Sequence, residues 1–342
     1  MTDHPVARRT VIKSAGLGIG AGLASGIASA SAQTAAPAAQ EIWSGEYWAH
    51  KGNVKLYMFR KRLTAPAANA PQQPVLFLVH GSSFSSRPGY DLQVPGQPDY
   101  SVMDMCAGFG FDVWTMDHEC YGRSTRTKSN SDIATGAEDL RIAAQVVQRE
   151  TGHKSFTYYG QSSGSLRAAL FAQNNPGYVK QLVLDAFVWT GKGSRTLEKR
   201  REGLALFRAS NMRPVDRAFF HTIFTRDKPG TSDPAIAEHL ADAELQFGNE
   251  VPTGTYVDMC SKLPLVDPTR IHCPVYIMRG EHDGIASDED ILGFFRALPN
   301  PDKHLSIMAG SAHVAPFGNN RHRFYHLLRQ YLTLPPRLDV QS

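Results

Sequence analysis

The chain has 342 residues, of which 42% are apolar and 20% charged, so it is long enough to bury a large hydrophobic core and is neither disordered nor fibrous in composition. Its 36 basic and 32 acidic residues leave a formal charge of +4, without the basic stripe expected of a nucleic-acid-binding protein. The one short basic run, residues 199–201, predicts a solvated helix face.

The N-terminal segment has the pattern of an export signal. Arg8 and Arg9 precede a weakly apolar stretch rich in Gly and Ala, which ends in the small-residue cleavage pattern of residues 30–32. The paired arginines resemble a bacterial twin-arginine signal, with an ordinary secretory signal or an uncleaved anchor as the alternatives. We therefore expect a signal peptide at 1–32, a flexible leader at 33–41, and a periplasmic or secreted protein. No later segment has eighteen consecutive apolar residues, so no stable membrane insertion is expected after cleavage.

Strand-like and helix-like segments alternate after residue 42. A turn at Gly52 between two strand-like runs, 44–50 and 54–60, predicts a hairpin, and the apolar run Val75–Val79 predicts a strand buried on both faces. Further strands are expected at 112–116, 156–159, 181–184, 275–278 and 304–308, and helices at 135–149, 163–173, 289–297 and 321–331. This alternation predicts an α/β fold with a mostly parallel sheet and helices on both faces.

One segment, residues 190–270, interrupts this alternation. It lacks a strong strand signal and contains helix-like pieces at 197–209, 216–224 and 234–247. We interpret it as a helical cap inserted into a core formed by residues 42–189 and 271–333, and a second domain unrelated to any site is the alternative.

The cysteines give no clear disulfide framework. None has CxxC spacing, and a core of the expected size is stable without crosslinks, so buried thiols and one bridge remain equal alternatives. The four are Cys106, Cys120, Cys260 and Cys273.

The strongest functional signal is Gly160-Gln161-Ser162-Ser163-Gly164, which follows a strand pattern directly and opens a helix pattern. In such a sharp turn, a side chain at either glycine would collide with neighbouring backbone. The turn would leave Ser162 exposed as a nucleophile, with helix N–H groups near a developing oxyanion. A plain glycine turn is the structural alternative.

A serine nucleophile needs a base, and the base needs an orienting acid. Asp283 and His313 each follow an apolar strand closely, in the chain order serine, acid, histidine. Because the carboxyl ends of parallel strands meet at one edge of a sheet, we expect Ser162, Asp283 and His313 to form a catalytic triad. Asp185, which ends another strand, is the main alternative acid, and Glu281 is a weaker one.

The other histidines carry less functional signal. His80 is interpreted as a structural, hydrogen-bonded residue, and His282 adjoins the candidate acid but could equally be solvent-exposed. His322 and His326 are four residues apart on a predicted helix but have no third ligand, so no metal site is predicted.

These motifs resemble the α/β-hydrolase family over about residues 43–332. The resemblance implies an oxyanion site in which backbone N–H groups of Ser82 and Ser163 are the donors, with Ser83 as the alternative to Ser82. Residues 117–124 are similar to the family's loop after the fourth strand, but Cys120 stands where glycine is common.

The triad implies hydrolysis through an acyl-enzyme on Ser162, with no cofactor or metal. Since a cap narrows access, we expect a small or medium carboxylic ester or lactone as the substrate. A carbon–carbon bond hydrolase or acyltransferase with the same triad, and a non-catalytic binding protein, are the alternatives. Arg87 and Arg123 are interpreted as surface residues rather than ligands of a substrate carboxylate. The candidate pocket residues are Ser83, Phe84, Trp189 and Phe317.

Overall fold

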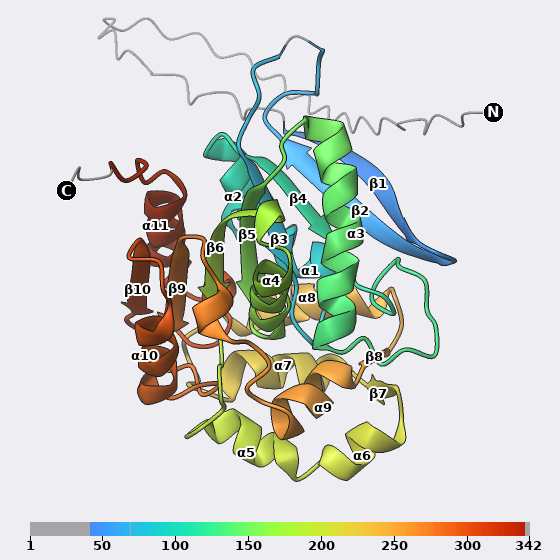
Figure 1. Ribbon diagram of the computed structural model, residues 1–342. Coiled ribbons are helices and arrows are strands. Elements are labelled where there is room, and N and C mark those ends of the chain that lie inside the picture. The colour runs from blue at the N-terminus through green and yellow to red at the C-terminus, as the bar shows by residue number, and fades with distance from the viewer. Residues whose placement is uncertain (1–41, 69, 339–342) are drawn as a thin grey trace, which may run out of the picture. The chain divides into compact units, whose positions relative to one another are not determined.

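The computed structural model describes residues 42–68 and 70–338, and the predicted export signal and leader lie outside them. Its central element is an eight-stranded sheet of order β1-β2-β4-β3-β5-β6-β9-β10 (Figure 1). Strands β1, β2 and β4 pair antiparallel, and the remaining neighbours pair parallel. The strands of this sheet are β1 (Trp43–Lys51), β2 (Val54–Arg62), β3 (Val75–Val79), β4 (Asp112–Met116), β5 (Phe156–Gln161), β6 (Val179–Asp185), β9 (Val275–Gly280) and β10 (Lys303–Met308).

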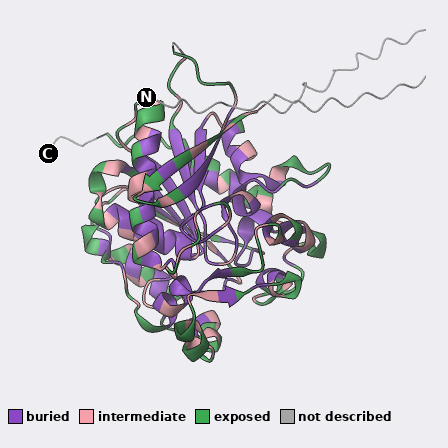
Figure 2. Cartoon of the chain, turned by 90° about the vertical axis from the view of Figure 1, so that its right-hand side faces the viewer, coloured by how far each residue is buried: buried purple, intermediate pink, exposed green. Residues whose placement is uncertain are grey.

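Helices cover both faces of this sheet, as the sequence predicts. In β3, Val75, Phe77 and Val79 pack into one hydrophobic cluster, whereas Leu76 and Leu78 pack into another. Figure 2 shows that the strands between these clusters are largely buried. The first cluster contains residues of α3 (Ile133–Thr151), α4 (Ser163–Asn174) and α10 (Asp288–Ala297), and the second contains residues of α2 (Val102–Gly108) and α11 (Arg321–Leu332).

The expected strands and helices of the α/β alternation are present, with ends shifted by at most two residues. Capping residues fix the ends of helix α3. At its start, the Asp132 side chain accepts a hydrogen bond from the backbone N–H of Thr135, and at its end Gly152 adopts the left-handed conformation with φ +75°. The short helix α2 is not predicted. Shorter elements are α1 (Ser86–Tyr90) and the 3-10 helices η1 (Pro98–Tyr100), η2 (Pro176–Tyr178), η3 (Pro268–Arg270) and η4 (Ala315–Phe317).

The segment between β6 and β9 is mainly helical, and Figure 1 shows its helices grouped at one end of the sheet. The predicted helix at 197–209 is interrupted around Gly203, and a two-stranded antiparallel sheet was not expected. Its elements are α5 (Arg195–Arg201), α6 (Leu204–Ala209), β7 (Met212–Pro214), α7 (Arg217–Thr225), α8 (Pro234–Leu245), β8 (Glu250–Pro252) and α9 (Gly254–Ser261).

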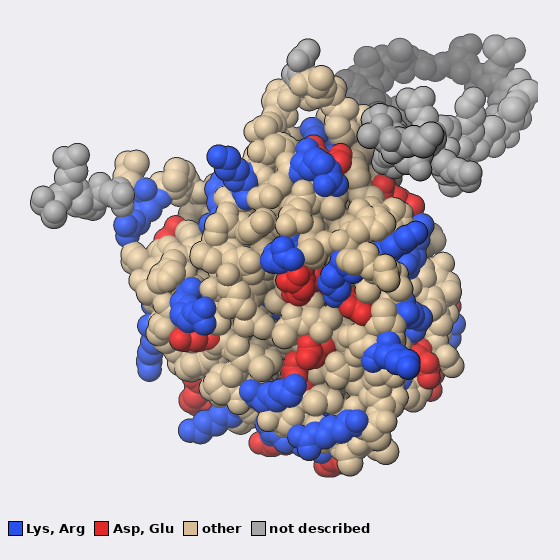
Figure 3. Space-filling view, turned by 45° about the vertical axis from the view of Figure 1, so that its right-hand side comes forward, with Lys and Arg blue, Asp and Glu red and all other residues tan. Residues whose placement is uncertain are grey.

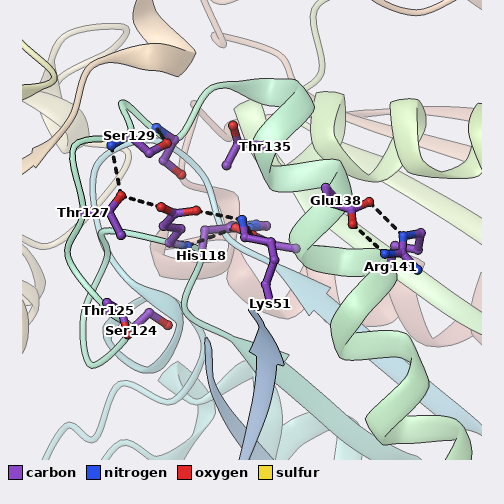
Figure 4. Close-up of polar contacts among 12 residues, drawn as sticks. Lys51, His118, Ser124, Thr125, Thr127, Ser129, Thr135, Glu138 and Arg141 are labelled. Carbon is purple, nitrogen blue, oxygen red and sulfur yellow. Dashed lines mark hydrogen bonds and ion pairs between the residues drawn. The ribbon is translucent and has the colours of Figure 1, made fainter. Parts of the chain in front are cut away.

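A polar network joins the tip of the β1–β2 hairpin to the loop after β4 (Figure 4). Lys51 forms ion pairs with Asp139 of α3 and with Glu119, whose oxygen lies 2.7 Å from the lysine nitrogen. His118 is 3.3 Å from Asp139, and its backbone N–H donates to the Nε2 atom of His80 (3.1 Å). The network therefore fixes the backbone next to the predicted oxyanion loop.

The four cysteines form no disulfide, so the hydrophobic core is not crosslinked. All four cysteines are unpaired, three of them buried and Cys273 partly buried. On the face drawn in Figure 3, basic and acidic side chains are interspersed. Among the described residues, no helix is both long and apolar enough to cross a membrane.

Candidate active site

Ser162 occupies the sharp turn between β5 and α4. Its backbone has φ 57° and ψ −124°, and its N–H donates to the carbonyl of Asp185 (2.9 Å). A Cβ atom on Gly160 would lie 2.5 Å from the Gly164 carbonyl oxygen, and one on Gly164 would lie 2.1 Å from the carbonyl oxygen of Val79. The collisions expected from the sequence are confirmed, and the turn requires both glycines.

Asp283 and His313 meet at the carboxyl ends of β9 and β10. The Nδ1 atom of His313 lies 2.9 Å from Oδ1 of Asp283, and the same oxygen accepts the backbone N–H of Ile285 (3.0 Å). The two loops approach closely because Gly280 has no side chain: a Cβ atom there would lie 2.5 Å from the carbonyl oxygen of Ala312. The strand ends thus bring together two residues that are 30 positions apart.

The electrostatics of this pair suit a carboxylate that supports a histidine. Burial alone would raise the pKa of Asp283, but the charge of His313 and the hydrogen bond to it outweigh burial and hold that pKa below its ordinary value of 3.8. Asp283 is therefore ionised near neutral pH. It can hold the Nδ1–H tautomer of His313, which leaves Nε2 free to accept a proton.

Asp185, the alternative acid, has other partners. Its Oδ2 atom accepts hydrogen bonds from the hydroxyl of Tyr159 (2.7 Å) and the side chain of Gln161 (3.5 Å), and it has no hydrogen bond to His313. Burial raises the pKa of Asp185 to about 7. Its backbone carbonyl positions Ser162, so the geometry favours Asp283 as the acid and gives Asp185 a supporting place.

Ser162 and His313 line the same cavity, yet in the described part of the chain no hydrogen bond joins the serine hydroxyl to the imidazole. Such bonds are often long in unliganded enzymes and tighten when substrate binds. The cavity has a free volume of about 20 Å³, room for about one water molecule. It is lined by Gly81, Ser82, Ser83, Phe84, Gln161, Ser162, Arg200, Ile223, Arg226, Tyr256, His313 and Val314.

Of the predicted oxyanion donors, Ser82 and its alternative Ser83 line this cavity, and Ser163 directly follows Ser162 at the start of α4. Within the described residues, the backbone N–H groups of Ser82, Ser83 and Ser163 make no hydrogen bond, and the Ser82 and Ser163 hydroxyls are 2.7 Å apart. Tyr121 and Arg213 each donate to the Ser82 carbonyl at 3.1 Å. Because that carbonyl belongs to the same rigid peptide unit as the Ser83 N–H, these contacts fix its direction.

Two of the four predicted pocket residues line the cavity, and two do not. Ser83 and Phe84 lie at the cavity wall, whereas Phe317 packs behind Phe84, with ring centroids 6.4 Å apart. Trp189 turns away because Asp290 accepts its backbone N–H (2.9 Å) and Val266 accepts its indole N–H (3.0 Å). Phe317 belongs to a buried hydrophobic cluster and Trp189 packs, partly buried, against another, so neither lines the cavity.

The cavity also contains charged residues that the sequence did not indicate. Arg200, expected on a solvated helix face, lines it instead, together with Arg226 and Tyr256. No motif marks these positions, because they come from different helices of the segment between β6 and β9. Arg87 and Arg123 lie on the surface, as interpreted from the sequence. Their Nη1 atoms are 4.0 and 2.5 Å from Oε1 of Glu46.

One cluster among the described residues has the side chains of a metal site. The ligand atoms of Asp227, Asp283 and His313 lie within 4.8 Å of one another. The Nδ1 atom of His313 and Oδ1 of Asp283 already bond each other, so this cluster is better described as the acid–base pair with a neighbouring carboxylate. His322 and His326 are exposed on α11.

His80 has the structural, hydrogen-bonded place that the sequence indicates. The ring of His80 is buried, with Nδ1 2.8 Å from the Gly81 carbonyl and Nε2 accepting from His118. Burial lowers the pKa of His80 well below its ordinary value, which keeps the ring neutral. His282 is partly exposed beside Glu281.

Comparisons with known proteins point to one fold. Residues 100–317 match the family Hydrolase_4, described as serine aminopeptidase, S33. No curated protein sequence matches significantly. A hydrolase from Pseudomonas aeruginosa superposes with a TM-score of 0.63 at 15% identity, over 84% of this chain and 98% of that one. An α/β hydrolase fold protein from Chitinophaga pinensis gives 0.61 at 15% identity, over 85% and 98%. A thermophilic esterase from Thermogutta terrifontis gives 0.58 at 16% identity, over 84% and 97%. At such low identities, these TM-scores show a shared fold and no more.

Proposed function

Because the chain belongs to the serine aminopeptidase, S33 family of α/β hydrolases, we propose that it is a serine hydrolase that cleaves small or medium carboxylic esters or lactones. The observation that carries the proposal is the hydrogen-bonded Asp283–His313 pair, whose histidine lines one cavity with a serine held in a strained strand-to-helix turn. One structural neighbour is itself described as an esterase.

The proposed reaction begins when Nε2 of His313 takes the hydroxyl proton of Ser162 as its oxygen attacks the substrate carbonyl. The oxyanion accepts hydrogen bonds from backbone N–H groups of Ser163 and of Ser82 or Ser83. His313 then protonates the leaving alcohol, and the acyl-enzyme forms. Water, deprotonated by the same histidine, releases the acid, and Asp283 stabilises the imidazolium in both steps.

The small cavity volume indicates that the site has to open before a substrate can bind. A free volume of about 20 Å³ is too small for an ester, so lining side chains have to move for one to bind. We propose that this segment acts as a helical cap, since Arg200, Ile223 and Tyr256 from its helices line the cavity. A covered site favours small soluble substrates over the surface of a polymer.

A hydrolysis screen tests this function. The protein starting at Gln33 is expected to hydrolyse soluble short-chain esters or lactones, and Ser162→Ala to lower kcat/KM by at least about 10³-fold. Ser44→Ala, an exposed serine on β1, serves as the control and is expected to retain full activity. Rapid hydrolysis of insoluble polyester without hydrolysis of soluble esters would contradict the proposed substrate class.

We also propose that the protein is exported by a twin-arginine-type signal, on the strength of Arg8, Arg9 and the small residues that follow the apolar stretch. Cell fractionation of a bacterial host tests it. The wild-type chain is expected in the periplasm or medium in a shortened form, and a double Arg8→Lys, Arg9→Lys variant is expected to stay inside. Export of that variant at the wild-type level would argue for an ordinary secretory route.

A further inference from the structure

Three arginines surround Tyr256 beside the candidate nucleophile. The guanidinium carbons of Arg200 and Arg213 lie 3.8 and 4.0 Å from the centroid of the Tyr256 ring. Arg226 lines the cavity that also contains Arg200, Tyr256 and Ser162. The arginines come from α5, β7 and the end of α7, so the fold gathers positive charge from three elements around a tyrosine of α9.

These arginines differ in how their charge is balanced. Arg226 lies 3.4 Å from Asp227, which neutralises it. Arg213 is 6% exposed and donates to the Ser82 carbonyl and the Ser83 hydroxyl, both of which are uncharged. Arg200 has no carboxylate partner among the described residues. Arg200 and Arg213 therefore carry positive charge without a carboxylate partner among the residues that the structure describes, and the Tyr256 ring is what both guanidinium groups face.

Each of these two arginines also has an unused donor. The Nη1 atom of Arg200 and the Nε atom of Arg213 are buried and make no hydrogen bond in the described part of the chain. An arginine donor buried without a partner is costly, and a guanidinium fits a carboxylate through two parallel hydrogen bonds. Arg200 lines the cavity that also contains Ser162, so a ligand bound there would contact its guanidinium group.

The pKa shifts in the cluster reflect its concentrated positive charge. Although burial alone would raise the pKa of Tyr256, the charges of Arg200, Arg213 and Arg226 lower it to about 7. Burial lowers the pKa of Arg200 below its ordinary value. A carboxylate bound beside them would raise both pKa values again, because it favours the charged guanidinium and the neutral phenol.

Resting on the proposed hydrolase function, we propose that the substrate is an ester that carries a free carboxylate, such as a monoester of a dicarboxylic acid. Arg200 binds the carboxylate, Arg226 and Tyr256 form the walls beside it, and the ester carbonyl lies at Ser162. Water adds across the ester bond: the acyl–oxygen bond breaks, the acyl carbon gains a hydroxyl from water, and the alcohol leaves with a proton. The products are a dicarboxylic acid, which ionises, and the alcohol.

Matched ester pairs test this specificity in the wild-type protein. Initial rates are measured for the monomethyl and dimethyl esters of succinic, glutaric, adipic and benzene-1,4-dicarboxylic acids, which differ in charge and little in shape. For at least one acid, we expect kcat/KM to be about 10- to 100-fold higher for the monoester. Equal or higher values for every diester, in a protein whose Ser162 reacts with a fluorophosphonate, would overturn the anionic specificity and leave the hydrolase function standing.

Variants of α5 assign the preference to Arg200. Arg200→Gln is expected to lower kcat/KM for the monoester about 10- to 100-fold more than for the matched diester, mainly through KM, so the ratio of the two values is the readout. Lys199→Gln removes the same charge from an exposed neighbour on that helix and is expected to keep the preference. Fluorophosphonate labelling of Ser162 shows whether each variant is folded.

The outcomes separate the two proposals. If Arg200→Gln loses labelling, Arg200→Lys is measured instead, and it is expected to retain part of the preference because it keeps the charge without the planar fork. An unchanged preference in a labelled Arg200→Gln protein would overturn the role of Arg200. Absence of both labelling and hydrolysis in the wild-type protein would refute the proposed function and this inference with it.

Discussion

Replacement of Asp283 by asparagine tests the acid–histidine pair most sharply. The carboxylate oxygen that contacts His313 also accepts the N–H of Ile285, while Oδ2 is buried without a partner. In Asp283→Asn the amide oxygen can keep both hydrogen bonds, but it no longer carries the charge that stabilises an imidazolium. The opposite amide orientation would place an NH₂ group against Nδ1, which forces the proton onto Nε2 and blocks the base.

The size of this effect follows from the geometry. Across the 2.9 Å hydrogen bond, the charge centres of carboxylate and imidazolium are about 4 Å apart, which is worth about 4 kcal/mol at an effective dielectric constant of about 20. We therefore expect kcat/KM to fall about 10³-fold in Asp283→Asn. The assay is ester hydrolysis at pH 7 to 8, with folding checked by thermal unfolding.

Asp185→Asn is the matched control for this prediction. Asp185 is buried at the end of a neighbouring strand, and its carboxyl, with a pKa of about 7, is already neutral in much of the population near neutral pH. An asparagine there can still accept from Tyr159, so we expect less than about a tenfold loss of activity. Greater loss in Asp185→Asn than in Asp283→Asn would refute the assignment of the acid.

Three further predictions concern stability, each measured by urea unfolding. Burial raises the pKa of Glu244 from 4.5 to about 8, so the wild-type protein loses stability as the pH rises from about 4.5 to 8. Glu244→Gln should lack this loss and gain about 1.4 kcal/mol of unfolding free energy per pH unit relative to wild type. Equal pH dependence of the unfolding free energy in both proteins would contradict this prediction. Gly164→Ala should cost more than about 3 kcal/mol of stability, because the new Cβ atom would collide with the carbonyl of Val79. Gly177→Ala is the control: its Cβ atom would meet no atom within 4 Å, so stability should change by less than about 1 kcal/mol. Similar losses in the two variants would argue against the close approach of Gly164 to that carbonyl. Cys120 has a φ of 70°, which is strained for a residue with a side chain, and its sulfur accepts a hydrogen bond from the N–H of Thr127. Both Cys120→Ala and Cys120→Gly lose this hydrogen bond, but only alanine keeps the backbone strain, so Cys120→Ala should be about 1 kcal/mol less stable than Cys120→Gly. The reverse order of stability would refute this account.

The sequence predicts the sheet and the acid–histidine geometry well, because both depend on local signals. Continuous apolar runs mark the buried parallel strands, and Asp283 and His313 follow two of them directly, so strand order alone brings them together. The departure at Cys120 also has a physical account: its φ of 70° is one that glycine adopts without strain, and the thiol hydrogen bonds accompany the strained conformation.

The cavity wall is less predictable because tertiary packing decides it. Helix α9 carries Tyr256 but has only a weakly amphipathic sequence, and Gly254 at its start is required by the carbonyl of Asn130, which a Cβ atom would approach to 2.5 Å. The basic run that contains Arg200 looks solvated until α5 packs beside α9. Trp189 follows a strand end, yet a carboxylate of α10 sets its direction.

Labelling with a fluorophosphonate tests the central claim most directly. The protein starting at Gln33 is incubated with the probe, the labelled peptide is located by mass spectrometry, and Ser162→Ala and His313→Ala are treated in the same way. An activated nucleophile predicts a single label at Ser162 in the wild-type protein, no label in Ser162→Ala and a strongly slowed reaction in His313→Ala. A folded wild-type protein that takes no label, or takes it at another serine, would contradict the account.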